Sequence, residues 1–417
     1  MAAHLLEYLQ ENSLTMKRIY IAASHQSKFG KLLGMTVPEI VTNAIEGVCK
    51  EINVDPSLLD VGACAAACNI SLNEQGLVAG LAASVPGLAG KPIESVENAC
   101  ASGGQAILST ILKLQAGWGE TGFAFGYEKM RDAEGKADGK LIGKALGMYS
   151  HPDERPGKLY VFPHLFAEIM SCYMKRYKVT EADLATIAVE EYANGNKSPI
   201  AQMNKVKVTL DDVLKIEGMN RYIVDGLPLK TYDCSQVTDG YAALILATEE
   251  GLKKLGVSKA DAVEIAGYAQ ATDPLLKEGR DVLRPAGAYH AMQKAYEMAG
   301  VTPQDVNVAE VHDCFTVMGA IATEVLGKAK PGEGAKYWVE GKARPDGPDR
   351  ECGINLSGGL IAKGHPIGAT GIAMLATCYT QLMGRASQGL QKKNANVAAT
   401  FNIGGAICAS VCTVLKR

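Results

Sequence analysis

The chain has 417 residues, of which 47% are hydrophobic, and its 42 basic and 45 acidic residues leave a formal net charge of −3. This length and apolar content allow two or three domains with a large core. No long run of one charge sign indicates a nucleic-acid or membrane-surface partner, and no apolar run is long enough and free enough of charge to span a bilayer.

Eleven cysteines are spread irregularly through the chain. The start of the chain lacks the charged and apolar regions of a signal peptide, so we expect free thiols in a reducing, cytoplasmic compartment. Cys64 and Cys68 form one closely spaced pair, but no second pair with zinc-ribbon spacing accompanies them. We interpret this pair as part of a buried strand or turn. Residues 1–16 resemble a short amphipathic leader whose role the sequence leaves open.

In chain order, residues 17–126 alternate between apolar strands and amphipathic helices. The β-branched stretch KRIYIAA at 17–23 predicts the first strand, and a threonine cap with a proline two residues later predicts a helix at 36–52. Further strands are predicted within 56–67, at 93–96 and at 121–126, and further helices at 76–85 and 103–117. Such alternation favours a parallel-type sheet covered by helices.

Residues 127–233 have a different character, with a polar Gly/Lys/Asp stretch, a proline-containing segment and helices such as 180–194. We interpret them as an inserted loop domain that lies over the core and recognises substrate. The core pattern returns at 238–250, and residues 262–417 then repeat the order of the first half at a period of roughly 240 residues. The sequence therefore predicts a duplicated α/β fold, with one half formed by 17–126 and 234–261 and the other by 262–417.

The most informative segment is Asn355–Gly371 (NLSGGLIAKGHPIGATG), in which five of seventeen residues are glycine. Glycine permits close approach of a ligand to the backbone, and Pro366 restricts the conformation of His365. We interpret the segment as an active-site loop. The alternative is a glycine-rich turn with an incidental histidine.

Cys100 stands where a predicted strand meets a predicted helix, and a serine and two glycines follow shortly after it. A thiolate there would face the unpaired N–H groups of the helix, which lower a cysteine pKa and bind a developing oxyanion. The motif indicates a nucleophile, with a buried core thiol as the alternative. His365 occupies the equivalent turn of the second half, so the repeat predicts that Cys100 and His365 meet, as in covalent acyl transfer.

A second motif, EVHDCFT at Glu310–Thr316, ends a predicted apolar strand. His312 and Cys314 are two residues apart and so share one face of an extended segment, while Asp313 points away. A thiol and an imidazole at the C-terminal end of such a strand suit ligand chemistry in an α/β sheet.

A metal site is the rival interpretation. Its ligands would be Cys100, His312, Cys314 and His365. No local pair among them has the spacing of known zinc sites, so the sequence favours catalysis without a metal.

Four segments together resemble the thiolase superfamily: NACASGGQA at 98–106, EVHDCFT, the Gly-His-Pro loop at 355–371 and FNIGGA at 401–406. The resemblance is to the sterol-carrier-protein and archaeal type, which has His-Asp-Cys-Phe where common thiolases have Asn-Glu-Ala-Phe. It extends from about residue 17 to residue 415 and includes DCSQVTDGYAALIL at 233–246. It implies a duplicated five-layer α-β-α-β-α thiolase fold with an inserted loop domain.

The resemblance also implies an activity, that of a thiolase (acyl-CoA C-acyltransferase) that makes or cleaves a β-ketoacyl-CoA. In that case Cys100 takes the acyl group, and His365 deprotonates it and helps to bind the thioester oxygen. His312 adds to the oxyanion hole for the enolate of the second acyl-CoA, and Cys314 is the acid/base that removes and returns the α-proton.

One position departs from the common pattern. Common thiolases carry the acid/base cysteine in a C-terminal Cys-x-Gly motif, but here that motif is Asn402-Ile403-Gly404, and Cys408 lies too far along to replace it. The departure favours Cys314 as the acid/base. Because the glycine is kept, the family pattern implies that the backbone N–H groups of Cys100 and Gly404 hold the oxygen of the tetrahedral intermediate.

Coenzyme A thioesters are the implied substrates, with no permanently bound cofactor. Acetoacetyl-CoA is the default, and a bulkier or aromatic substrate such as benzoylsuccinyl-CoA stays open, as do the residues that bind CoA. The resemblance implies a homodimer or tetramer, and it leaves open a small partner subunit with a zinc ribbon and an OB fold.

Two alternative functions are compatible with parts of this pattern. A β-ketoacyl synthase works from acyl carrier protein and pairs its cysteine with two histidines or with His/Asn, which fits the His-Asp-Cys-Phe motif less well. A thiolase-like scaffold or aldolase subunit would lack acyl transfer, but such relatives typically lose the nucleophile, and Cys100 is present.

Overall fold

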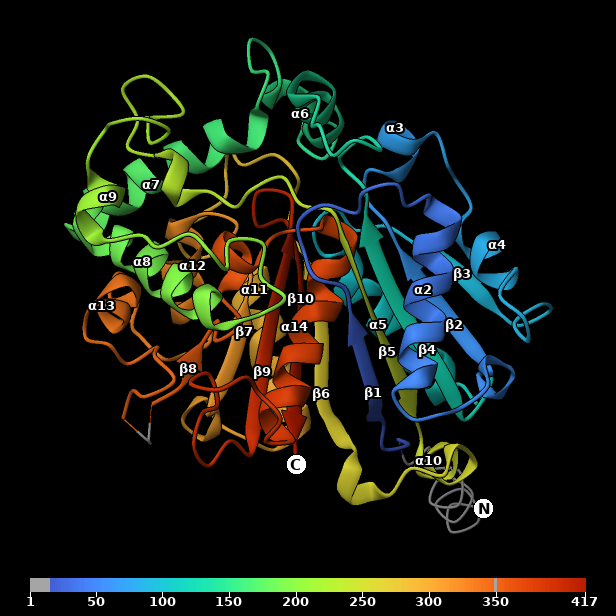
Figure 1. Ribbon diagram of the computed structural model, residues 1–417. Coiled ribbons are helices and arrows are strands. Elements are labelled where there is room, and N and C mark those ends of the chain that lie inside the picture. The colour runs from blue at the N-terminus through green and yellow to red at the C-terminus, as the bar shows by residue number, and fades with distance from the viewer. Residues whose placement is uncertain (1–15, 349–350) are drawn as a thin grey trace, which may run out of the picture.

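The computed structural model describes residues 16–348 and 351–417, so apart from Met16 the predicted leader at 1–16 lies outside the described residues. The chain forms a ten-stranded sheet with helices packed on it (Figure 1). Within the described ranges, no helix combines the length and the apolar character needed to cross a membrane. All eleven cysteines lie in these ranges, and each is a free thiol.

The first half of the sheet contains five strands with their covering helices. The strands are β1 (Tyr20–Gln26), β2 (Val61–Ala65), β3 (Ile93–Val96), β4 (Thr121–Glu128) and β5 (Gly240–Ala247). The helices are α2 (Val37–Lys50), α3 (Asn69–Asn73), α4 (Val78–Ala83), α5 (Ser102–Gln115) and α10 (Glu249–Leu255), with 3₁₀ turns at Pro56–Leu58 and Lys259–Asp261.

The second half also contributes five strands, with four covering helices. Its strands are β6 (Val263–Thr272), β7 (Val308–Val311), β8 (Gly353–Ile354), β9 (Val397–Gly404) and β10 (Ala409–Lys416). Its helices are α11 (Ala286–Ala299), α12 (Thr316–Val325), α13 (Gly334–Val339) and α14 (Ile367–Leu382), with a 3₁₀ turn at Pro303–Asp305 and a π-helical turn at Gly359–Lys363.

The strand order confirms the predicted duplication. The whole sheet runs β3-β2-β4-β5-β1-β6-β10-β9-β7-β8. Counted within each half from the outer edge inward, both halves have the order 3-2-4-5-1. The halves join where β1 and β6 pair, Tyr20 with Glu264 and Ile21 with Val263.

The prediction of a parallel-type sheet is only half right. In each half the outer three strands are parallel, but β4 pairs antiparallel with β5, and β9 pairs antiparallel with β10. The reason lies in the connections. A parallel neighbour needs a crossover, whereas β10 follows β9 after a turn of a few residues and must reverse direction.

Helices form three layers around the two half-sheets. The buried side chains of α5 and α14 pack with those of both halves in one central cluster, while α2 packs on the outer face of the first half and α11 and α12 on that of the second. The two central helices come very close, since a Cβ on Gly103 would lie 2.9 Å from the backbone nitrogen of Gly371. This is the five-layer arrangement expected from the resemblance.

Local sequence accounts for these elements. Helix α2 begins after Thr36, whose side chain forms a capping box with Glu39. Strand β5 (GYAALILA) is buried at every residue, as expected for a strand covered by helices on both faces.

The inserted segment lies across one end of the core (Figure 1, green). It contains α6 (Gly139–Gly147), α7 (Val161–Tyr177), α8 (Glu181–Lys197) and α9 (Leu210–Leu214), with 3₁₀ turns at Pro152–Glu154 and Thr231–Asp233. Helix α8 begins after Thr180, which forms a capping box with Asp183.

Candidate active site

Cys100 lies in a tight turn between β3 and α5, directly before Ala101, the N-cap residue of α5. Ala99 has a left-handed φ of 48°. Ser102 stabilises the turn, because its Oγ accepts the N–H of Asn98 at 2.8 Å and donates to the carbonyl of Ala99 at 2.6 Å. A left-handed alanine is held only where its surroundings fix it. The turn therefore presents the thiol at the start of the helix.

His365 lies in the loop between the π-helical turn and α14. Its backbone N–H donates to Thr238 Oγ1 at 3.1 Å, and its Nδ1 is 2.7 Å from Thr370 Oγ1. Because Thr370 Oγ1 donates its proton to the Pro366 carbonyl at 3.0 Å, it accepts the Nδ1 proton of the imidazole. Burial lowers the pKa of His365 to about 3. The ring is therefore neutral, and its Nε2 carries a lone pair.

The segment His312–Cys314 follows β7. His312 and Cys314 both line one cavity, as their two-residue spacing predicts. Asp313 is turned the other way, and its carboxylate accepts the backbone N–H groups of Leu360, at 2.8 Å, and Ile361, at 3.2 Å. Asp313 thus anchors the turn that leads to His365.

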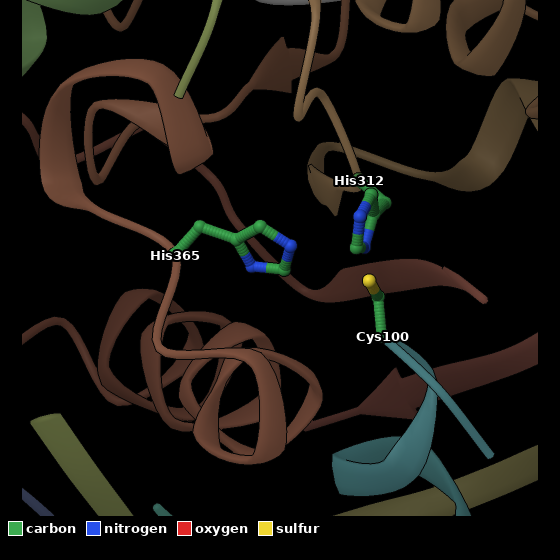
Figure 2. A group of neighbouring side chains, drawn as sticks. All are labelled: Cys100, His312 and His365. Atoms are coloured by element: carbon green, nitrogen blue, oxygen red, sulfur yellow. The ribbon is translucent and has the colours of Figure 1, made fainter. Parts of the chain in front are cut away.

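The side chains of Cys100, His312 and His365 point toward one another (Figure 2). The sulfur of Cys100 and one ring nitrogen of each histidine all lie within 4.8 Å of one another. They come from three segments that are far apart in the sequence: the turn before α5, the end of β7 and the loop before α14. The structure thus brings together three of the four predicted catalytic side chains, and Cys314 lines the same cavity.

The cavity beside these side chains has a volume of about 300 Å³. Its walls come from α6, the start of α7 and the core loops, and no Asp, Glu, Lys or Arg is among the described residues that line it. The larger apolar side chains of the wall are Met130, Ile142, Leu146, Val161, Phe162, Phe166, Val237, Phe315 and Ile367.

The state of the Cys100 thiol differs from the sequence prediction. The helix N-terminus was expected to lower its pKa, but desolvation and then the charges of Glu128 and Glu97 raise the pKa of Cys100 to about 12. These effects outweigh the helix, which begins two residues later, at Ser102. The thiol is therefore protonated at neutral pH and must lose its proton as it attacks.

Cys314 is also protonated at rest. Burial raises its pKa well above the ordinary value, and the neighbouring Cys100 and Asp313 add to the effect. A thiol that keeps its proton can serve as an acid toward a leaving group.

Gly404, the predicted second donor of an oxyanion hole, ends β9 directly against the Cys100 turn. A Cβ on Gly404 would come within 2.4 Å of the carbonyl oxygen of Asn98. Only glycine permits this close approach of the two backbones. The role of its N–H group stays a prediction.

Asn402 and Thr370 hold the site together, and no motif in the sequence assigns either residue a role. Asn402 Nδ2 donates to His312 Nδ1 and to the Cys100 carbonyl, both at 3.0 Å, and its Oδ1 accepts the Gly104 N–H at 3.2 Å. One feature of the sequence could have placed Asn402 at the site: it is two residues before Gly404 on a strand, so the two residues share a face.

The rival zinc interpretation has a partial geometric basis. A thiolate and two neutral imidazoles are a donor set that binds Zn²⁺, and three such atoms converge here. However, the bond from Asn402 leaves the proton of His312 on the other ring nitrogen, where a metal would have to displace it. The hydrogen bonds of the site thus favour acid/base chemistry.

Comparison with known protein families gives two matches. The family model described as "Thiolase, N-terminal domain" matches residues 19–250, and that described as "Thiolase C-terminal domain-like" matches residues 269–417.

Curated relatives cover most of the chain. An acetyl-CoA acetyltransferase of Methanothermobacter thermautotrophicus is 34% identical over 94% of this chain and 97% of its own. Sterol carrier protein 2 of Oryctolagus cuniculus is 34% identical over 76% of this chain and 57% of its own. The benzoylsuccinyl-CoA thiolase subunit BbsB of Thauera aromatica is 28% identical over 93% and 95% of the two chains.

Solved structures of proteins with low sequence identity share the fold. A chain of the structure titled "Ltp2-ChsH2(DUF35) aldolase" superimposes with a TM-score of 0.77 at 19% identity, covering 96% of this chain and 98% of that one. Human mitochondrial 3-ketoacyl-CoA thiolase superimposes with a TM-score of 0.68 at 17% identity, covering 96% and 99%.

Proposed function

This chain belongs to the thiolase superfamily and is an acyltransferase, and from that premise we propose that it makes or cleaves a β-ketoacyl-CoA through an acyl group carried on Cys100. The observation that carries the proposal is the convergence of the Cys100 sulfur with two neutral histidines beside an apolar cavity. An acyl-accepting thiol needs a base within reach and donors for the oxyanion, and these residue types supply both.

In the first half-reaction, the sulfur of Cys100 attacks the thioester carbon of an acyl-CoA while Nε2 of His365 takes its proton. The backbone N–H groups of Cys100 and Gly404 hold the oxyanion of the tetrahedral intermediate. When the C–S bond to CoA breaks, Cys314 gives its proton to the departing thiolate. The acyl group is then on Cys100, His365 is protonated and Cys314 is a thiolate.

In the second half-reaction, the Cys314 thiolate removes an α-proton from a second acyl-CoA, and His312 donates a hydrogen bond to the enolate oxygen. The α-carbon attacks the acyl group on Cys100, and the released sulfur takes back the proton held by His365. All three groups return to their starting states. Thiolytic cleavage follows the same steps in reverse.

The acyl group that fits best is an uncharged one. Every described wall residue of the cavity is apolar or neutral, and a carboxylate buried there would lack a partner, which is costly. We therefore propose acetoacetyl-CoA or a longer apolar β-ketoacyl-CoA as substrate. Benzoylsuccinyl-CoA, the substrate named for the BbsB relative, carries a free carboxylate and fits this wall less well.

We also propose a homodimer or tetramer, working in a reducing, cytoplasmic setting in which the nucleophile stays a thiol. Strand β3 is at one edge of the sheet and pairs with β2 on its inner side, and a strand edge of this kind favours pairing with a second copy. A small partner subunit is a further proposal, supported by the fold neighbour whose title pairs Ltp2 with ChsH2(DUF35).

The proposal is tested by intact mass and peptide mapping after brief mixing with acetyl-CoA. We expect one acetyl group, located on Cys100, and none on a Cys100→Ser variant. Absence of the adduct in folded wild-type protein, with several acyl-CoAs and after supply of a partner subunit, would favour the alternative of a scaffold or aldolase subunit.

A further inference from the structure

We propose that Asn402 is a positioning residue that keeps the proton of neutral His312 on Nε2, so that this ring can donate a hydrogen bond to a substrate oxygen. The identity of that oxygen, the enolate of the second acyl-CoA, rests on the proposed function. The position of the proton rests on hydrogen bonds within the folded chain.

The orientation of the Asn402 amide is fixed by two backbone groups that cannot exchange roles. The Gly104 N–H is a donor and so must face Oδ1, at 3.2 Å. The Cys100 carbonyl is an acceptor and so must face Nδ2, at 3.0 Å. A flipped amide would place like groups against each other at both contacts. The side chain therefore presents an N–H, and not an oxygen, to its third neighbour.

Two motif glycines make room for this amide. A Cβ on Gly371 would lie 2.3 Å from Asn402 Oδ1, and a Cβ on Gly104 would lie 3.0 Å from the same atom. Gly104 belongs to α5 and Gly371 to α14, so the amide oxygen occupies the crossing of the two central helices. The site is thus built around an amide at this position.

His312 is the third neighbour. Its Nδ1 is 3.0 Å from Asn402 Nδ2, so Nδ1 accepts and carries a lone pair. A neutral imidazole with a lone pair on Nδ1 has its proton on Nε2. Among the described residues, Nε2 of His312 is buried and has no hydrogen-bond partner. A buried donor without a partner calls for an explanation, and a substrate oxygen would supply the missing acceptor.

The two histidines therefore have opposite tautomers. Thr370 accepts the Nδ1 proton of His365 and leaves its Nε2 as a base, whereas Asn402 donates to Nδ1 of His312 and leaves its Nε2 as a donor. Two identical side chains beside one sulfur (Figure 2) are thereby given different chemistry by the residue behind each ring.

The first test is nuclear magnetic resonance of wild-type protein labelled with ¹⁵N in its histidines, with the His312 signals identified by comparison with a His312→Gln sample. We expect the Nε2-protonated tautomer for His312 across the neutral pH range. This test needs no activity, so it separates failure of the inference from failure of the proposed function. An Nδ1-protonated His312 would overturn the inference.

The second test is the pH dependence of Asn402→Asp. A carboxylate beside Nδ1 raises the pKa of His312 and accepts the Nδ1 proton. Below that pKa the imidazolium still donates from Nε2, but above it the proton that leaves is the one on Nε2. Relative to wild type, kcat/KM for the carbon–carbon step should therefore fall as pH rises, by roughly 10² to 10³-fold at the alkaline limit.

No group that faces His312 titrates in the pH range over which kcat/KM would be compared. These groups are His365, Cys100 and Cys314. The pKa of His365 is lowered to about 3, that of Cys100 is raised to about 12, and that of Cys314 is raised well above its ordinary value. All three stay neutral in the resting enzyme between about pH 6 and 9.

The matched control is Thr400→Val. Thr400 is on the same strand and face, is buried, and bonds Thr413 Oγ1 at 2.6 Å. We expect its activity relative to wild type not to vary with pH. If Asn402→Asp also shows a pH-independent ratio while it is folded, Asn402 acts only as a structural residue and the inference is wrong. If Asn402→Asp does not fold, the inference is decided by the tautomer of His312 measured in wild-type protein.

Discussion

The imidazole rings of His312 and His365 meet edge to face, with centroids 4.9 Å apart and an interplanar angle of 90°. Burial lowers the pKa of both rings, and the nearness of His365 lowers that of His312 further. Neither ring carries a charge at rest, so two histidines can share a small space without repulsion. In the proposed mechanism, a proton taken from Cys100 by His365 would place one positive charge in this space.

The first prediction concerns Cys314→Ala. Without its acid/base, the enzyme should still accept an acyl group on Cys100, although more slowly, because Cys314 no longer protonates the departing CoA thiolate. Formation or cleavage of the carbon–carbon bond should fall by about 10² to 10⁴-fold, the usual contribution of a positioned acid/base. Acylation is measured by intact mass, and carbon–carbon cleavage by loss of acetoacetyl-CoA. The control is Cys412→Ala, which removes a buried thiol on β10 that is not among the residues lining the cavity; it should affect stability alone. Full turnover by Cys314→Ala would exclude the assigned role.

The second prediction concerns the titration of Cys100, whose pKa is raised to about 12. Below its pKa, the thiolate fraction grows tenfold for each pH unit. Alkylation of Cys100 by iodoacetamide should therefore keep rising from pH 7 to beyond pH 10, whereas a model peptide thiol with a pKa of about 8.5 levels off above pH 9. The rates are followed by peptide mapping. A plateau for Cys100 below pH 9 would mean that the helix N-terminus dominates after all.

Much of the fold could be predicted because its signals are local. Helix α2 follows a threonine cap and was located within a few residues, and the core pattern predicted at 238–250 contains β5, a continuous apolar run. The antiparallel pairings were missed because the direction of a strand depends on how its connection runs in space. In the first half, β5 enters the sheet only after the inserted segment, so no local pattern shows its direction. The domain boundaries at 126, 233 and 261 stay predictions.

The candidate site was predictable in its residues and not in its protonation states. Cys100, His312 and His365 stand in recognisable motifs, and the repeat explains why they meet. The pKa of Cys100 was predicted in the wrong direction, because burial and the charge of Glu128 act through space. In the sequence, Asn402 is notable only because it stands where common thiolases have a cysteine. Its role depends on a contact with Cys100, about 300 residues away, which no local pattern shows.

The third prediction concerns a buried pair of carboxyl groups beneath the active-site loop. Asn355 Nδ2 donates to Glu191 Oε1 at 2.8 Å. Burial and the nearby Asp313 raise the pKa of Glu191 well above its usual range. Since Asp313 accepts backbone N–H groups of Leu360 and Ile361, we assign the proton to Glu191 and the charge to Asp313. Glu191→Gln should then be tolerated, whereas Asp313→Asn should weaken the loop that carries His365 and lower kcat.

The pH dependence of stability tests that assignment. A carboxyl group whose pKa is higher in the folded than in the unfolded state contributes stability below the unfolded value, near 4.5, and loses it as pH rises toward the folded value. The free energy of unfolding of Glu191→Gln should thus nearly equal that of wild type at pH 4. Above pH 4.5 it should exceed the wild-type value by up to about 1.4 kcal/mol for each pH unit. Urea denaturation at pH 4, 6 and 8 measures this. A difference that does not change with pH would place the proton elsewhere.

The fourth prediction concerns the charge of the acyl group. The cleavage of 3-oxohexanoyl-CoA and 3-oxoadipyl-CoA should be compared, because their acyl chains have the same number of carbons and differ by a terminal carboxylate. The described cavity wall offers that carboxylate no cationic partner, and a buried unpaired charge costs at least several kcal/mol. We therefore expect kcat/KM to favour the uncharged substrate by about 10³-fold or more. An Ile142→Lys variant adds a cation to the α6 wall. It should reduce the difference in kcat/KM between the two substrates if that difference arises because the carboxylate lacks a cationic partner. Equal cleavage of the two substrates by wild type would show that the acyl chain leaves the cavity for solvent, whereas cleavage of neither would count against the proposed function itself.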